Sequence, residues 1–213
     1  MVQKKAKGSE PQRPRGRPRQ YDPEQALAKA AESFWKNGYA ATSLDDLVAA
    51  TGMNRPSLYA AFGAKRDLYL KTLKRYLQQS RAKSLEILTV SPTLRVFLKR
   101  FYEAALDIYW SDDAEARGCY SISTAPAQAV TDPGVRDFLA ASIAGTDAFL
   151  SRVIGEARDR GEISSSVDPA GLARLATATL HTIAVRSRVG VPRRELSALA
   201  ATTIDLICGP EKK

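Results

Sequence analysis

The chain has 213 residues, of which 44% are hydrophobic and 26% are charged, an ordinary composition for a folded globular protein. Its 32 Lys and Arg exceed its 23 Asp and Glu, and the net charge of +9 favours an anionic partner such as nucleic acid. Two cysteines and a single histidine, His181, argue against a disulfide scaffold and a metal centre, so we expect no metal and no cofactor. No apolar run approaches the ~20 residues of a membrane span and no signal-peptide core opens the sequence, so we expect a cytoplasmic protein without a membrane partner.

The positive charge is concentrated at the N-terminus. Residues 1–20 carry seven Lys and Arg against one Glu, whereas the last 133 residues carry 17 basic against 16 acidic side chains. This asymmetry is typical of a nucleic-acid-binding part joined to a neutral part. We therefore expect residues 1–20 to form a disordered basic arm.

Within this arm, Arg15, Arg17 and Arg19 alternate with Gly16 and Pro18. Arginines in such a setting can lie in a narrow A·T-rich minor groove, where the electrostatic potential is most negative. The segment resembles the Arg-Gly-Arg-Pro core of AT-hook peptides. The alternative is an untargeted basic linker that adds non-specific affinity through counterion release.

Three helices are predicted after the arm. Residues 23–37 place apolar side chains at helical spacing, with Pro23 in the first turn and Gly38 just past the end. Thr42 or Ser43 can cap a short second helix, which Gly52 ends. A third helix then begins only a few residues later, and two short helices joined this tightly indicate a helix-turn-helix.

The second helix of a helix-turn-helix enters the major groove with its N-terminal residues against the base edges. Here that helix begins with Asn54 and Arg55, which can bind adenine and guanine, respectively, through two hydrogen bonds each. Ser57 could reach a base or a phosphate. Three further side chains are suited to phosphate oxygens or lie at a helix N-terminus, and we assign them to the DNA backbone: Ser43, Tyr59 and Lys65.

The rest of the sequence is again helical, with no sustained two-residue alternation that would indicate a sheet. The apolar spacing and the Gly and Pro positions predict further helices over residues 65–83, 94–110, 119–130, 132–161, 168–190 and 192–207. The predicted fold is therefore all-α. We expect a three-helix DNA-binding domain at residues 21–67, followed by a larger helical domain at residues 68–213.

Residues 38–47 and 51–65, with their Leu-Tyr-Ala-Ala-Phe-Gly-Ala-Lys ending, closely resemble the DNA-binding domain of TetR-family transcriptional repressors of the AcrR-like branch. The resemblance implies a homodimer on a double-stranded DNA operator and a helical domain that binds a small-molecule effector. Family residues at five of our candidate positions commonly touch DNA, namely Ser43, Arg55, Ser57, Tyr59 and Lys65. One departure is Ala61, where many relatives carry His, so a polar contact is missing there.

The resemblance also assigns roles to the larger domain. In the family the last two helices pair with their copies as a four-helix dimer interface, which presents two recognition helices to a pseudo-palindrome. Arg117-Gly118-Cys119, followed by Asp132-Pro133, resembles one recurring subgroup. Helices that would enclose the family's ligand pocket carry several aromatic residues and the histidine, from which we select Phe101, Trp110, Tyr120, Phe149 and His181. The alternative for each is a place in the ordinary core.

We thus expect a sequence-specific regulator, most simply a repressor that an effector releases from a palindromic operator. The alternatives are an activator, or an architectural DNA-binding protein that uses the basic arm alone. An enzyme is disfavoured because no Gly-rich phosphate loop or HExxH motif is present.

Overall fold

The computed structural model describes residues 22–110 and 116–210, and these residues form nine helices without a strand. The predicted all-α fold is confirmed. The candidate arm residues Arg15, Arg17 and Arg19 lie outside the described residues. The helices are α1 Pro23–Ala41, α2 Leu44–Thr51, α3 Arg55–Phe62, α4 Lys65–Thr89, α5 Leu94–Tyr109, α6 Tyr120–Ala129, α7 Pro133–Asp159, α8 Pro169–Arg188 and α9 Arg193–Cys208.

Local caps explain where many of these helices begin. The side chains of Asp22, Ser43, Asn54, Asp132 and Asp168 each accept hydrogen bonds from backbone N–H groups in the first turn of the helix that follows. These donors have no partner inside the helix, so a capping oxygen stabilises the end. The predicted starts of α1, α3, α7 and α8 are thereby confirmed, and Ser43 rather than Thr42 caps α2.

One predicted helix end is wrong, and another is confirmed although the assigned bounds of α1 run past it. The helix from Lys65 continues to Thr89 rather than ending near Lys83, because Ile87 extends its buried face into the core of the larger domain. Gly38 lies within α1 rather than after it, at φ 78° and ψ 168°. These angles lie far from helical values, so the continuous helix does end near the predicted position and a short turn of helix follows.

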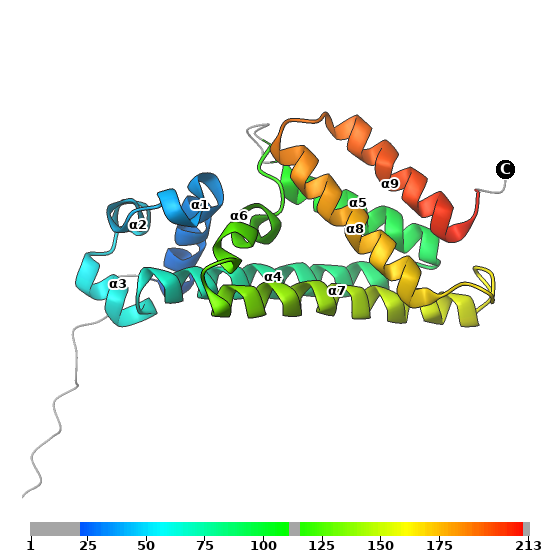
Figure 1. Cartoon of the computed structure of the whole chain (residues 1–213), viewed down its shortest axis with the longest axis horizontal. Helices are drawn as coiled ribbons and strands as arrows, with labels where there is room; N and C mark the ends of the chain where they lie inside the picture. The colour runs from blue at the N-terminus through cyan, green and yellow to red at the C-terminus, as the bar shows by residue number, and fades with distance from the viewer. Residues whose placement is uncertain (1–21, 111–115, 211–213) are drawn as a thin grey trace, which may run out of the picture.

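The helices form a small end and a larger body (Figure 1). Helices α1–α3 make the small end, and α4 runs from it along the length of the body beside α7. In the body, α7 packs against α6 and α8, while α5, α8 and α9 pack against one another. Helix α6 lies between the two parts and contacts α1 as well as α7.

Two hydrophobic cores hold these parts, and α4 contributes to both. Leu68, Tyr69 and Leu73 belong to the core of the small end, whereas Ile87 belongs to the core of the body. Buried side chains of α6 and α7 also join the first core, among them Tyr120 at 0% exposure. The small end and the body are therefore packed together, with α4 as a shared element.

Helix α7 is the one described helix that is long and apolar enough to cross a membrane by length and composition. It carries Asp147 and Arg152 and packs along α6 and α8, and its buried residues Leu150, Val153 and Ile154 belong to the body core. Only 22% of its most apolar stretch is buried within this chain, so the packing accounts for part of its apolar character.

Candidate nucleic-acid interface and cavity

Helices α2 and α3 form a helix-turn-helix at the outer end of the molecule. The turn depends on Gly52, which has a φ of 71° and donates its N–H to the carbonyl of Val48. Met53, Leu58 and Phe62 are buried beneath the motif, with 4%, 2% and 5% exposure. This packing leaves the opposite side of α3 in solvent, where it is free to meet a DNA groove.

The first turn of α3 exposes most of the candidate base-reading group. Asn54, Arg55 and Tyr59 are exposed, and Ser57 is half-buried. Asn54 caps the helix, because its Oδ1 accepts the backbone N–H of Ser57 at 2.9 Å. A two-bond contact from Asn54 to adenine would need that same oxygen and would uncap α3. The geometry therefore favours Arg55 over Asn54 as a base reader.

Arg55 is held at the start of α3 by an acidic side chain that the sequence analysis missed. Its Nη2 and Nε donate to Oδ1 of Asp45 at 2.7 and 3.3 Å, and this hydrogen-bonded ion pair raises the pKa of Arg55. Both partners are exposed, so the pair is weak and easily exchanged for another acceptor. Asp45 thus positions the guanidinium without preventing a contact to guanine.

Two of the three candidate phosphate-contacting residues, Ser43 and Lys65, lie where α2 and α4 begin, and the third, Tyr59, is exposed on α3. Ser43 and Asp46 form a capping box, in which Ser43 Oγ donates to the Asp46 carboxylate at 2.7 Å and accepts the Asp46 N–H at 3.1 Å. The Ser43 hydroxyl lowers the pKa of Asp46, and so does the Ser43 backbone N–H, which donates to the same carboxylate at 2.7 Å. Lys65 lies with its Nζ 4.5 Å from the centre of the Tyr39 ring, and its burial lowers the pKa of its ammonium group.

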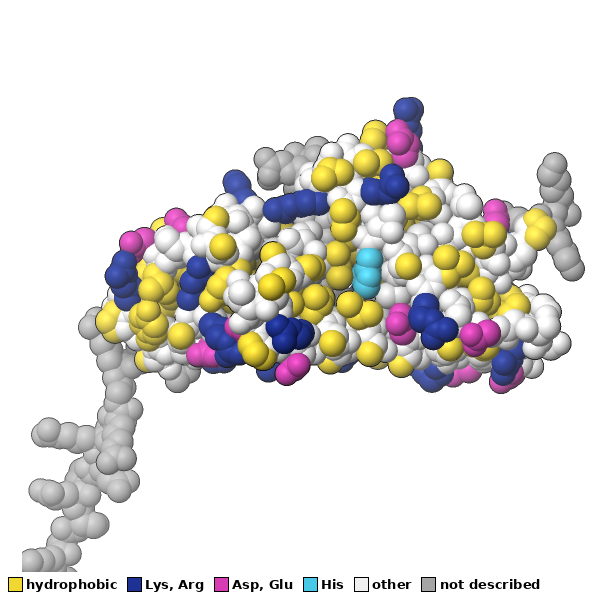
Figure 2. Space-filling view, viewed as in Figure 1, with side chains coloured by type: hydrophobic (Ala, Val, Ile, Leu, Met, Phe, Trp, Pro, Cys, Tyr) yellow, Lys and Arg dark blue, Asp and Glu magenta, His cyan; other side chains and the backbone are white. Residues whose placement is uncertain are grey.

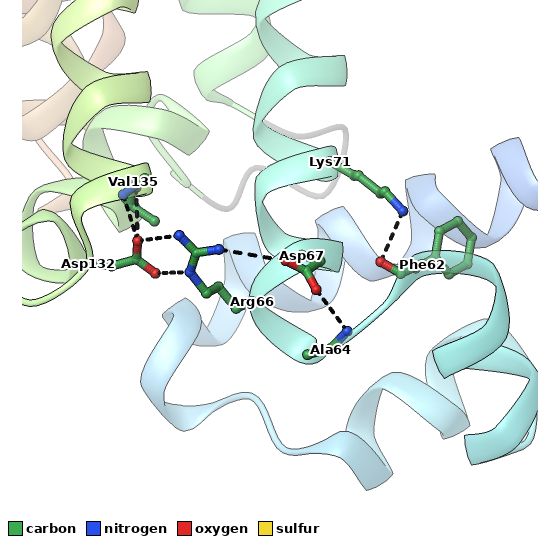
Figure 3. A network of polar contacts seen from close by, with 8 residues as sticks. Phe62, Ala64, Arg66, Asp67, Lys71, Asp132 and Val135 are labelled. Atoms are coloured by element: carbon green, nitrogen blue, oxygen red, sulfur yellow. Dashed lines mark hydrogen bonds and ion pairs between the residues drawn. The ribbon is translucent and has the colours of Figure 1, made fainter.

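An ion pair ties the base of this motif to the body (Figure 3). Arg66, near the start of α4, donates from Nε and Nη2 to the two carboxylate oxygens of Asp132 at 2.6 and 2.9 Å. Asp132 also caps α7 by accepting the N–H groups of Gly134 and Val135. Hydrogen bonds from Arg66 therefore lower the pKa of Asp132. A two-bond pair of this kind fixes orientation as well as distance.

A second link joins the last turn of α8 to α1. Arg188 donates to the backbone carbonyls of Trp35, Lys36 and Arg117 at 3.1 to 3.2 Å. Two of these carbonyls lie just before the break at Gly38, where a helix end presents unpaired acceptors and favours a cation. The Arg117 guanidinium lies 4.1 Å from the centre of the Trp35 ring.

The Arg117-Gly118-Cys119 segment has a structural role at this link. Gly118 has a φ of 64°, and a Cβ on it would lie 2.5 Å from the carbonyl oxygen of Ala184 in α8. Only glycine allows this backbone conformation and this close approach at low cost. The segment therefore presses directly against α8.

A cavity lies in the body between α4, α5, α7 and α8, with Ser121 and Ile122 of α6 also lining it. It consists of two adjoining hollows of about 100 and 200 Å³. The residues that line both hollows are Leu77, Ser80, Ser84, Phe101, Thr146 and Leu180. Three of the candidate ligand residues lie here, since Phe101 lines both hollows, His181 the first and Phe149 the second.

The other two candidate ligand residues lie elsewhere. Tyr120 is fully buried in the core of the small end, where its hydroxyl pairs with Thr72 at 2.7 Å. Trp110 follows the last turn of α5, half-buried against the body core, and lines neither hollow. Helical periodicity shows that a residue is buried but not against which neighbour, which is why the sequence could not separate these two from Phe101.

His181 occupies the boundary between cavity and surface. Burial lowers its pKa, and the nearby Asp147 of α7 acts in the opposite direction. In Figure 2 the histidine is surrounded mainly by hydrophobic and uncharged side chains. The imidazole is therefore neutral at pH 7. Among the described residues, no group of three or more His, Cys, Asp or Glu is placed to hold a metal ion.

The last two helices expose apolar side chains on their outer faces. Leu175, Val185 and Val189 on and just after α8 are 38%, 52% and 74% exposed, and Leu206 on α9 is 66% exposed. Large apolar side chains gathered on neighbouring helices mark an interaction surface more often than an ordinary solvated face.

Two family models match the chain. "Bacterial regulatory proteins, tetR family" matches residues 26–72, and "Tetracyclin repressor-like, C-terminal domain" matches residues 96–202. The first match covers the helix-turn-helix, and the second covers most of the body.

Curated relatives and solved structures agree with these matches. The HTH-type transcriptional repressor ComR of Escherichia coli strain K12 is 31% identical over 90% of this chain and 91% of its own length. The uncharacterized HTH-type transcriptional regulator YezE of Bacillus subtilis strain 168 is 34% identical over 75% of this chain and 82% of its own. A cysteine mutant of the TetR family transcriptional regulator CifR, complexed with 26-bp double-strand operator DNA, superposes with a TM-score of 0.79 at 29% identity and covers 88% of this chain and 98% of its own.

Proposed function

The chain belongs to the TetR family of bacterial regulatory proteins, and we propose that it is a transcriptional repressor released from a palindromic operator by a small-molecule effector. The observation that carries this proposal is the exposed first turn of α3, with Arg55 at its surface and a buried helix-turn-helix behind it. The repressor name of the E. coli relative supports the sign of regulation.

In this proposal the DNA contacts divide into readers and anchors. Arg55 exchanges Asp45 for guanine in the major groove, while Asn54 keeps its cap and helps to orient α3. Ser57 reaches a base or a phosphate. Three side chains hold the phosphate backbone: Ser43, Tyr59 and Lys65. Outside the described residues, Arg15, Arg17 and Arg19 of the arm follow the adjacent minor groove.

A homodimer through α8 and α9 supplies the second recognition helix. Its interface uses the exposed apolar faces of the two helices, which would form a four-helix arrangement with their copies. A two-fold dimer of this kind binds half-sites about one DNA turn apart, so the operator is a palindrome.

The cavity is placed to control that spacing. Its walls include α7 and α8, and these helices hold the DNA-binding end through Asp132 and Arg188. Helix α4 also lines the cavity, and it begins at Lys65 beside the helix-turn-helix. These helices would have two arrangements, which differ in the separation of the recognition helices. An effector that binds one arrangement more tightly shifts the equilibrium toward it, and the size of the shift is set by the difference in affinity.

We divide the roles as a basic arm at residues 1–20, a DNA-binding unit at 21–67 and an effector-binding and dimerisation unit at 68–213. The protein is then a cytoplasmic regulator rather than an enzyme. An activator is the second candidate, because the HTH-type transcriptional activator FasR of Mycolicibacterium smegmatis is 31% identical over 88 residues, and the same DNA contact can block or recruit polymerase.

Selection of random DNA duplexes by the full-length protein tests the proposal. We expect enrichment of a palindrome whose half-sites lie about one helical turn apart. A variant that lacks residues 1–20 serves as the control and should select the same palindrome with lower affinity. Enrichment of A·T-rich duplexes without a palindrome would instead assign binding to the arm and contradict the repressor proposal.

A further inference from the structure

The second hollow of the cavity combines an apolar lining with one charged side chain. Its walls carry Leu77, Leu85, Phe101, Phe149 and Leu180, and its single ionised residue is Arg81. No Asp or Glu lines either hollow. An apolar chamber with one cation and no anion suits a molecule that has an apolar body and an anionic end.

Arg81 differs from the other cation of the cavity. Lys83, which lines the first hollow, has an acidic neighbour in Glu86 at 3.1 Å, in an exposed pair that offsets only part of its charge. Arg81 forms no ion pair with any residue in the described ranges 22–110 and 116–210. Arg81 is exposed where it lines the second hollow, so its guanidinium can exchange water for a ligand carboxylate, whose geometry its fork of donors matches.

A glycine makes room for this guanidinium. On α7, a Cβ at position 145 would lie 2.5 Å from Arg81 Nη2, whereas Gly145 lets the side chain of Arg81 lie across the helix at the cavity wall. Glycine in a helix lowers helix stability relative to alanine, and it is tolerated here where the arginine needs the space. Arg81 and Gly145 thus form a seat that joins α4 to α7.

We infer that the cavity binds a medium-chain amphiphile whose carboxylate pairs with Arg81 and whose apolar chain fills the two hollows. The inference rests on the proposed effector site and names its ligand class. Only together do the two hollows, of about 100 and 200 Å³, reach the lower limit of small-molecule pockets, which favours a slim chain over a bulky ring system. The bound molecule would contact α4 through Arg81 and α7 through Thr146 and Phe149, and both helices carry the DNA-binding end.

Calorimetric titration of the DNA-free, full-length protein with decanoate, decanol and decyltrimethylammonium tests this inference. We expect decanoate to bind at least about tenfold more tightly than decanol, because a charge-assisted contact contributes that much. Arg81→Gln should remove this advantage and leave decanol binding unchanged. Gly145→Ala should also weaken the binding of decanoate, and it should preserve the fold because alanine favours a helix. Lys83→Gln is the matched control and should leave decanoate binding unchanged.

Several results would overturn the inference. They are no decanoate binding to the wild-type protein, equal affinity for decanoate and decanol, tighter binding of the ammonium compound, or an Arg81→Gln variant that binds decanoate as well as the wild type. The titration contains no DNA, so a failure of the proposed repressor function does not alter it. If decanoate binds through Arg81 but leaves operator affinity unchanged, the ligand inference stands and the proposed release mechanism fails.

Discussion

The small end and the body differ in where the polar side chains assigned to function lie. At the α1–α3 end they lie at the surface, where they cap helices or form exchangeable pairs such as Arg55–Asp45, with side chains 56% and 74% exposed. In the body, by contrast, the side chains around the cavity are mainly apolar or carry hydroxyl groups, among them Ser80, Ser84 and Thr146. The difference teaches that function at the small end depends on exposed chemistry, whereas function in the body depends on shape and on the few charges near the cavity.

The largest effect is expected when a buried side chain of the body core is truncated. Leu98 is 0% exposed, and Leu98→Ala should lower the free energy of unfolding by about 2–5 kcal/mol, because both apolar contacts and close packing are lost. Urea denaturation at fixed protein concentration measures this. The neighbouring residue Lys99 is exposed, so Lys99→Ala is the control and should change the free energy of unfolding by less than about 0.5 kcal/mol. Equal stability of the two variants would contradict the assignment of the core.

The next largest effect concerns Arg55, the proposed base-reading residue of the small end. Arg55→Ala should weaken operator binding by about 10- to 100-fold and relax the preference at one base pair, because a two-bond contact to guanine is lost. Anisotropy titrations with single-base operator variants measure it. Asp45→Asn, which removes only the exposed ion pair, should change affinity by less than about fivefold. A uniform loss on every duplex with Arg55→Ala would show that Arg55 anchors rather than reads.

A smaller effect separates anchors from readers. Lys65→Ala should weaken binding to operator and scrambled DNA by a similar factor, and it should reduce the slope of log affinity against log salt by about one. Titrations at several salt concentrations measure both quantities. A loss confined to the operator would place Lys65 among the readers.

The smallest effect is a pH dependence in the body. Burial lowers the pKa of His181 in the folded protein below its ordinary value near 6.5, so the unfolded chain takes up the proton first as the pH falls. Its contribution to stability should therefore be complete above pH 6.5 and decline as the pH falls from there toward the folded-state pKa. Comparing unfolding free energies at pH 7.5 and 5.5, we expect a smaller decline for His181→Asn than for the wild type. An identical decline would show that His181 does not titrate differently on folding.

Local signals were sufficient for much of the fold. Helix starts at Asn54, Asp132 and Asp168 were predictable because a cap acts within three residues of sequence, and Pro23 marked the start of α1. The helix-turn-helix was predictable for the same reason. The end of α4 was not predictable. No local stop signal marks it, and its last turns are held in place by the packing of Ile87 in the body core.

Long-range contacts explain what the sequence could not predict about the sites. Arg66 and Asp132 are 66 positions apart, and Arg188 and Trp35 are 153 apart, so no local pattern indicates either link. Asn54 shows a second limit, since the same amide can cap a helix or read adenine and only the geometry distinguishes the two. Tyr120 and Phe101 both lie on apolar helix faces, yet only one of them faces the cavity.

The measurement that tests the central claim most directly is an anisotropy titration of the selected palindrome and of a scrambled duplex of equal length, at near-physiological salt. The account predicts that the dimer binds the palindrome at least about 1,000-fold more tightly. Equal affinity for the two duplexes, with equal salt dependence, would contradict it and would leave only non-specific binding through the positive charge.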